Sequence, residues 1–85
     1  MLDDADDAGR TMQRDRAAGE RKFNCLLAAN ADIPDKPRIY VVRGQAYEAI
    51  GEKALAADDY RTAERLLHPE DLMTTGVRRA LSRVT

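Results

Sequence analysis

Two proline-containing stretches, IPDKP at residues 33–37 and HPED at residues 68–71, divide this chain of 85 residues into three segments. Proline fixes φ and lacks a backbone N–H, so helices accept it in their first turn but not in their interior. Pro34 disfavours a helix at the residue before it. Pro37 and Pro69 each predict a helix that starts nearby, and two acidic residues after Pro69 suit the first turn of the second of these helices. These stretches therefore mark where helices are expected to end and begin.

The segment between them opens with β-branched residues, as a strand would, yet its apolar pattern is helical. Apolar residues recur at intervals of three and four, whereas the alternation that a strand needs fails beyond Arg43. The pattern predicts a helix over residues 37–50. Gly51 suits its end, since glycine adopts the left-handed conformation at least cost. The apolar face of this helix comprises Ile39, Val42, Ala46 and Ile50.

Two later stretches carry a similar pattern. EKALAADDYRTAERLL, residues 52–67, and EDLMTTGVRRALSRV, residues 70–84, each place apolar residues on one face and charged residues on the other. Both are predicted to be helices. The apolar stripe of the first comprises Ala56, Tyr60, Ala63 and Leu67, and that of the second comprises Leu72, Met73, Gly76, Val77, Ala80, Leu81 and Val84.

The N-terminal third gives a weaker signal. GERKFNCLLAAN, residues 19–30, predicts a helix, and a thin apolar seam in the very polar stretch before it has helical spacing. Three arrangements stay open for that first stretch: a frayed helix, a helix continuous with the next one, or a break near Ala18–Gly19. The seam comprises Leu2, Ala5, Gly9 and Met12.

Composition argues against several classes of protein. The net charge of −1 argues against broad nucleic-acid binding, which needs a basic face. No stretch approaches the ~20 apolar residues of a membrane span, and the acidic start is unlike a secretory or transit signal. Cys25 is the only cysteine, so no internal disulfide is possible, and we expect it to be a small core residue. The expected location is cytoplasmic.

Gly44 falls inside a predicted helix, where glycine costs roughly 1 kcal/mol relative to alanine. One use of that cost is the close approach of two helices. We therefore expect Gly44 to lie against Ala56 and Ala63 in a narrow antiparallel hairpin, with Tyr47 and Tyr60 filling the space beside them.

The stretch from Tyr40 to Pro69 resembles a tetratricopeptide repeat, a helix–turn–helix unit of ~34 residues. It departs from the family pattern at Arg43, where leucine is usual, at Lys53, where an aromatic residue is common, and at Pro69, which arrives one residue late. A buried unpaired guanidinium is costly, so we expect the stem of Arg43 to pack and its head to reach water or a carboxylate. The matching residues are Tyr40, Gly44, Ala46, Tyr47, Ile50, Gly51, Ala56, Tyr60, Ala63 and Pro69.

The resemblance implies an all-α fold of antiparallel helix hairpins, stacked as a right-handed solenoid of about two repeats plus a terminal capping helix. One domain then spans residues 1–85. Its clear repeat covers residues 37–69, a weaker repeat covers residues 3–36, and the terminal helix covers residues 70–84.

The resemblance also implies a non-catalytic interaction or scaffold module. The family lays short protein segments in a concave groove lined by the first helix of each unit. Val41 and Gln45 stand where carboxylate-tail binders of the family carry lysine and asparagine, so a carboxylate-tail ligand is disfavoured. The expected groove is mildly basic and is formed by Arg38, Val41, Gln45, Glu48 and Ala49 on one helix and by Thr75, Arg79, Ser82 and Arg83 on the last.

Two other uses of these surfaces stay open. About three repeats are normally needed for stability, so a shorter chain is expected to form a homo-oligomer, with a dimer favoured and apolar residues of the first or last helix at its centre. The alternative is a small dimeric DNA-binding protein that uses the basic last helix. In the homo-oligomer, the acidic start of one chain (Asp3, Asp4, Asp6, Asp7) is expected to meet the basic end of another (Arg78, Arg79, Arg83).

No catalytic residue, cofactor site, metal site or membrane partner is expected. His68 is the only histidine, so a histidine-based metal cluster cannot form, and beside Pro69 it suits a helix cap or a surface position. The glycines are scattered, and none begins a phosphate-binding loop. The adjacent acids Asp58 and Asp59 point to different sides of a helix.

Overall fold

The computed structural model describes residues 4–29 and 36–85, and all the regular structure in these ranges is α-helical, as predicted. Residues 1–3 and 30–35, with Leu2 of the seam and the helix break expected at Pro34, lie outside the described ranges. The helices are α1 (Asp4–Arg14), α2 (Arg16–Ala29), α3 (Lys36–Ala49), α4 (Lys53–Leu66) and α5 (Leu72–Val84).

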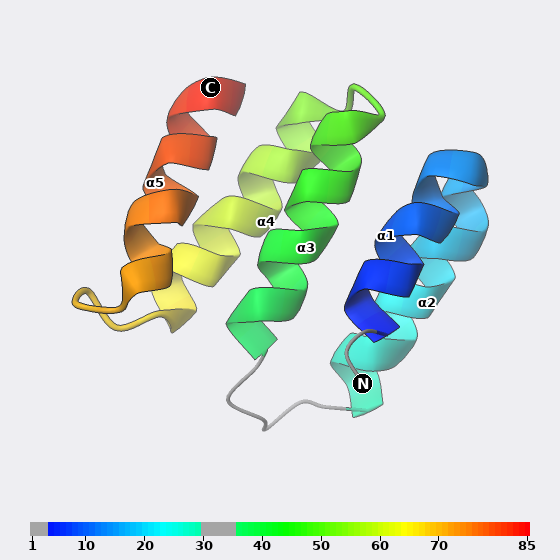
Figure 1. Ribbon diagram of the computed structural model, residues 1–85, viewed down its shortest axis with the longest axis horizontal. Helices are drawn as coiled ribbons and strands as arrows, with labels where there is room; N and C mark the ends of the chain where they lie inside the picture. Colours follow the sequence, from blue (N-terminus) through cyan, green and yellow to red (C-terminus); the bar gives the residue numbers. More distant parts are fainter. Residues whose placement is uncertain (1–3, 30–35) are drawn as a thin grey trace.

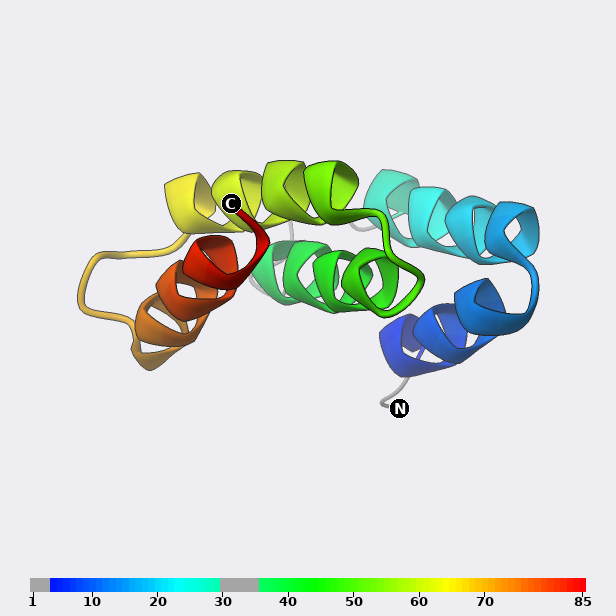
Figure 2. The same cartoon turned by 90° about the horizontal axis from the view of Figure 1, so that it is seen from above.

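The helices form two layers. Figure 2 shows α1, α3 and α5 in one layer and α2 and α4 in the other. Consecutive helices run in opposite directions, and α3 lies between α1 and α5 across the molecule (Figure 1). The most extensive packing joins α3 to α4, and α1 also packs against α3. The contact between α2 and α3 is much smaller, so the first two helices meet the rest mainly through α1.

The first two helices separate at Asp15, not near Ala18–Gly19. Asp15 accepts a hydrogen bond from the backbone N–H of Ala18 at 3.3 Å, the kind of side-chain contact that starts a new helix. Gly19, inside α2, instead allows α1 and α2 to pack closely, since a Cβ there would collide with the backbone of Met12 in α1. The helical seam of α1 is confirmed for the residues described, because Ala5, Gly9 and Met12 are buried.

The hairpin of α3 and α4 is confirmed, with one correction to its contact. A Cβ on Gly44 would lie 2.8 Å from Cε1 of Tyr60, and all three of its nearest neighbours belong to that ring. Tyr60 thus lies directly over Gly44, a place that we had assigned to Ala56 and Ala63. Both alanines are fully buried in the same core.

The end of α3 and the start of α5 test the predicted helix boundaries. Gly51 follows α3 with φ +86°, as predicted for the end of that helix. The last helix begins two residues later than expected, because Asp71 is its N-cap and accepts from the backbone N–H of Met73 at 2.8 Å. Pro69 therefore lies in the turn before the cap. On the predicted apolar face, Leu72 and Gly76 are exposed.

One apolar core joins the helices of both layers, and Phe23, Tyr60, Met12 and Val77 are among its largest fully buried residues. Cys25 is exposed, which corrects the expectation of a core cysteine. The inner side of α2 is occupied instead by Phe23 and the half-buried Leu26. None of the helices described is long and apolar enough to cross a membrane.

Adding a methyl group at Gly44 should destabilise the protein. In Gly44→Ala the new Cβ would stand 2.8 Å from the buried ring of Tyr60, so the ring or the helix must shift. Such overpacking costs about 1–3 kcal/mol, and better helix propensity returns up to ~1 kcal/mol. We expect a net loss of about 1 kcal/mol in the free energy of unfolding, measured by urea denaturation.

The matched control is Gly76→Ala in α5. A Cβ there has no neighbouring heavy atom within 4 Å, so the same change should stabilise the protein by up to ~1 kcal/mol. Equal effects of the two substitutions would contradict the close contact between Gly44 and Tyr60.

Candidate functional site

A groove of about 380 Å³ opens between α3 and α5. Tyr60 of α4 lines it although the residue is fully buried, so the tyrosine forms the floor. Four of the residues predicted for a peptide groove lie around this one hollow, although they come from helices far apart in the sequence. The groove is lined by Val41 and Gln45 of α3, Tyr60 of α4, and Met73, Gly76, Val77, Arg79, Ala80 and Arg83 of α5.

Glu48, which was also predicted for the groove, is not among its lining residues but joins α3, α4 and α5 by hydrogen bonds. Arg83 of α5 donates to both of its oxygens, from Nε at 2.7 Å and from Nη2 at 3.0 Å. The hydroxyl of Tyr60 donates to Oε1 of Glu48 at 2.9 Å. The hydrogen bond from Arg83 holds the pKa of Glu48 below its ordinary value. Burial, with the bond to Glu48, raises the pKa of the Tyr60 phenol.

The other predicted groove residues do not line this hollow. Arg38 faces α1, where its Nη2 lies 3.7 Å from Oδ2 of Asp6. Ala49, Thr75 and Ser82 are exposed on α3 and α5 outside the lining. Helical spacing predicts which face of a helix a residue is on. It does not predict which part of the neighbouring helix that face packs against.

A second hollow, of about 220 Å³, lies between α1 and α3. Gln45 lines both hollows and therefore stands on the ridge between them. The sequence did not predict that α1 lines a hollow. The apolar seam of α1 predicts a helix, but it does not indicate which helix packs against that seam. The lining residues are Asp6, Gly9, Arg10, Gln13, Val42, Gln45 and Ala46.

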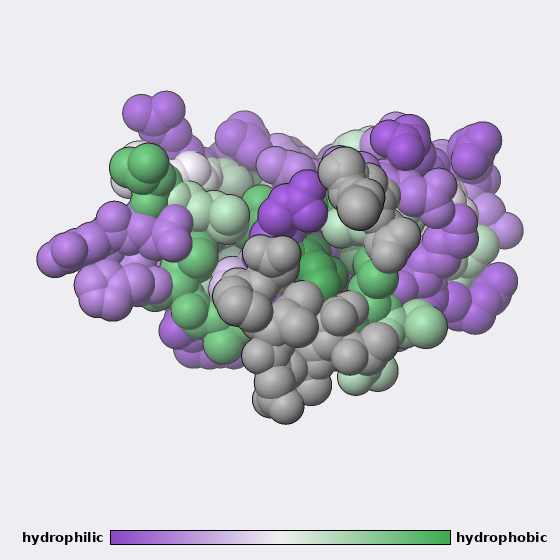
Figure 3. All heavy atoms as spheres, turned by 60° about the horizontal axis from the view of Figure 1, so that its bottom comes forward, coloured by the Kyte–Doolittle hydropathy of each residue, from purple (hydrophilic) through white to green (hydrophobic). Residues whose placement is uncertain are grey.

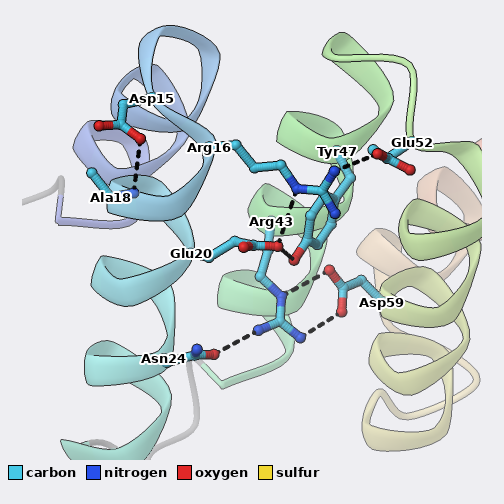
Figure 4. Close-up of polar contacts among 9 residues, drawn as sticks. All are labelled: Asp15, Arg16, Ala18, Glu20, Asn24, Arg43, Tyr47, Glu52 and Asp59. Carbon is cyan, nitrogen blue, oxygen red and sulfur yellow. Dashed lines mark hydrogen bonds and ion pairs between the residues drawn. The ribbon is translucent and has the colours of Figure 1, made fainter.

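A polar network connects α2 to the α3–α4 hairpin (Figure 4). At its centre Arg43 donates from Nε to Oδ2 of Asp59 at 2.8 Å and from Nη2 to Oδ1 at 2.7 Å. A third bond runs from Nη1 to Oδ1 of Asn24 at 3.2 Å. We expected the head of Arg43 to reach water or a carboxylate, and the second of these is found. Burial raises the pKa of Asp59, while the hydrogen bonds from Arg43 act in the opposite direction.

The network continues toward the start of α2. The hydroxyl of Tyr47 donates to Oε2 of Glu20 at 2.7 Å, and Arg16 bonds to both Glu20 and Glu52. Burial and the bond to Glu20 raise the pKa of Tyr47 to about 12, and the same bond lowers the pKa of Glu20. These groups therefore keep their ordinary charges over a wide pH range and serve to hold three helices together.

The terminal charges that we expected to meet between chains have partners within one chain. On the acidic side, Oδ2 of Asp7 lies 2.7 Å from Nζ of Lys22. On the basic side, Nε of Arg78 lies 2.9 Å from Oε2 of Glu64. Arg79 has no ion pair in the described part of the chain.

The residues singled out for metal or catalytic chemistry are dispersed. His68 is exposed in the turn before α5, where its Nδ1 accepts from the backbone N–H of Glu70 at 3.1 Å. Asp58 is exposed and Asp59 buried, as expected for adjacent helical residues. Within residues 4–29 and 36–85, no group of three or more His, Cys, Asp or Glu side chains could hold a metal ion.

Comparison with known proteins gives no relative: no family model matches the chain, and no curated protein or solved structure is significantly similar to it.

Removing one partner of the central ion pair should cost more stability than removing both. Arg43→Leu leaves the carboxylate of Asp59 buried without its main partner, for which we expect a loss of about 3 kcal/mol. The double variant Arg43→Leu/Asp59→Leu replaces the pair by apolar groups and should recover most of that loss. Urea denaturation of the wild type, both single variants and the double variant measures the coupling.

The exposed pair of Arg61 and Asp58, 3.4 Å apart on α4, provides the control. Arg61→Leu should change stability little, since exposed ion pairs contribute little. A double variant as unstable as Arg43→Leu alone would contradict the interpretation.

Proposed function

We propose that this chain is a non-catalytic module that binds a segment of another protein in the groove between α3 and α5. The observation that carries the proposal is the meeting of Val41, Gln45, Arg79 and Arg83 around one hollow with an apolar floor. An apolar floor supplies most of the binding free energy at such sites, and a few polar groups fix the orientation of the ligand.

The tetratricopeptide interpretation is part of this proposal. Three features support it: α1–α2 and α3–α4 each form an antiparallel pair, α1 packs beside α3, and α5 continues the same layer. In this interpretation α1, α3 and α5 are the first helices of successive units. The groove then lies on the face that the family uses for ligands, and α5 covers the end of the stack.

The size and shape of the groove suit a peptide. Its volume lies at the small end of the range for ligand sites, roughly 300–1,000 Å³, so it accepts one or two side chains rather than a whole cofactor. Val41 and Met73 are only half-buried, so they can lose further exposed surface when a ligand covers them. The open rim leaves room for a chain to enter and leave.

The DNA-binding alternative gains no support from the contacts of α5. Arg78 and Arg83 are engaged with carboxylates of the same chain, which leaves Arg79 as the arginine of α5 that forms no ion pair with a described residue. A single unengaged cation is a small footprint for a polyanion. Protein binding is therefore the function that we propose, and the cytoplasmic location stays a prediction from the sequence.

Filling the groove should abolish peptide binding. Gly76→Met places a long side chain in the open space above α5, whereas Gly76→Ala leaves most of that space free. We expect peptides selected from a random phage-displayed library on the wild-type protein to bind the alanine variant normally. They should bind the methionine variant at least about tenfold more weakly, by fluorescence polarisation. Amide shifts on binding should concentrate in α3 and α5.

Two results would contradict the proposal. One is a library that yields no peptide. The other is a set of peptides that binds Gly76→Met as well as the wild type or shifts amides mainly outside α3 and α5. Thermal unfolding of both Gly76 variants shows whether their folds are intact.

Self-association is a second proposed use of the surface, and a specific observation favours it. Leu72 is 93% exposed and Leu66 is 49% exposed, and both lie at the turn between α4 and α5. Figure 3 looks onto the face that lies at the bottom of Figure 1 and shows apolar residues, in green, exposed on it. Exposed apolar residues that gather on one face commonly mark a contact surface.

A dimer that uses this surface should depend on Leu72. We expect sedimentation equilibrium at micromolar concentration to give the mass of a homodimer for the wild type, and Leu72→Ser to shift the equilibrium toward monomer. Thr75→Ser, an exposed change one turn away, should leave the mass unchanged. A folded wild-type monomer at that concentration would remove this part of the proposal.

A further inference from the structure

We propose that the segment bound between α3 and α5 is acidic and carries an aliphatic side chain, which enters the hollow over Gly76 while a neighbouring side-chain carboxylate meets Arg79. This inference rests on the proposed function and specifies the class of its ligand. Three features of the groove carry it. They are Gly76, which no packing contact among the described residues explains, an aliphatic lining, and Arg79, which forms no ion pair with the described residues.

Gly76 has no packing reason to be glycine. At Gly44 and Gly19 an added Cβ would collide with a neighbouring helix, but at Gly76 it would meet no atom of the described residues within 4 Å. The residue lies inside α5, where glycine costs roughly 1 kcal/mol relative to alanine. The missing side chain deepens the hollow and exposes the helix backbone. Close approach of a ligand is the use of glycine that remains.

The lining around Gly76 selects an aliphatic side chain. Val41, Met73, Val77 and Ala80 surround the hollow, and the fully buried Tyr60 closes it below. The hydroxyl of Tyr60 is already engaged with Glu48, so the floor offers no free polar group to a ligand hydroxyl. Methionine adapts its shape to branched ligands.

The charge of the groove is positive. Arg79 and Arg83 line it, and no Asp or Glu is among its described lining residues. Arg83 is held by both oxygens of Glu48, so these two charges offset one another. Arg79 is exposed and has no ion pair among the described residues, so it supplies the net charge. A carboxylate on the ligand provides the missing complement.

Gln45 supports a peptide rather than a small anion. Its side chain is exposed on the ridge of α3 beside the groove, and its amide both donates and accepts hydrogen bonds. An extended peptide backbone presents a donor and an acceptor in each residue, so a carboxamide can bind it in either direction.

Three fluorescein-labelled nonapeptides test the proposal by fluorescence polarisation. The first has a central leucine flanked by aspartates in a Gly/Ser background. The second has lysines in place of the aspartates, and the third has serine in place of the leucine. We expect the first to bind at least about tenfold more tightly than either of the others.

Variants separate the charge from the hollow. Arg79→Glu should weaken the binding of the acidic peptide at least about tenfold and strengthen the binding of the lysine peptide. Arg65→Glu, the same change at an exposed position of α4 outside the groove, should leave both affinities unchanged. Gly76→Met should weaken the leucine peptide and, by filling the hollow, remove its advantage over the serine peptide.

The outcomes distinguish this inference from the function on which it rests. If the lysine peptide binds as well as the acidic one and Gly76→Met blocks both, the ligand class is wrong but the groove still binds peptides. If none of the three nonapeptides binds, the inference about the ligand class fails. The proposed function fails as well only if the random library also yields no peptide that responds to Gly76→Met. Arg79 is exposed, so Arg79→Glu should leave the fold intact. It therefore tests the charge of the groove even if Gly76→Met unfolds the protein.

Discussion

The ring of Tyr60 holds the centre of the molecule together. It lies over Gly44 and thereby fixes how closely α3 and α4 approach. Its hydroxyl bonds to Glu48 of α3, and Glu48 holds Arg83 of α5. One buried side chain thus links three helices, first by packing and then by hydrogen bonds. Because the same ring forms the floor of the groove, the contacts that stabilise the fold also fix the shape of the candidate binding site.

The molecule uses two kinds of helix contact. Apolar residues of α2, α3, α4 and α5 share one core, and charged and hydroxyl groups add hydrogen bonds between α2, α3 and α4. An apolar contact tolerates small displacements, but the two-pronged bond between Arg43 and Asp59 requires one relative position of α3 and α4. We infer that the network sets the alignment of the helices while the core supplies most of the stabilisation.

A polar network that aligns the helices and a core that stabilises them together suit a module that binds a peptide. A groove held rigidly by its own framework loses little conformational freedom on binding, so more of the contact free energy appears as affinity. The adaptable part of the proposed site is small: Met73, the exposed arginine Arg79 and the carboxamide of Gln45. The rest of the lining is fixed by Tyr60, Val77 and Ala80, which are buried.

The sequence by itself determined the helices and most of their faces, because periodicity, proline positions and Gly51 act locally. It also predicted that the head of Arg43 reaches water or a carboxylate, since an unpaired guanidinium inside the protein is costly. Only the tertiary structure decided that the carboxylate is Asp59, that Tyr60 covers Gly44, and that Arg38 faces α1 while Arg79 lines the groove. Those outcomes depend on how far one helix slides along another. That offset is set by the sum of many packing contacts between distant residues, which no local pattern records.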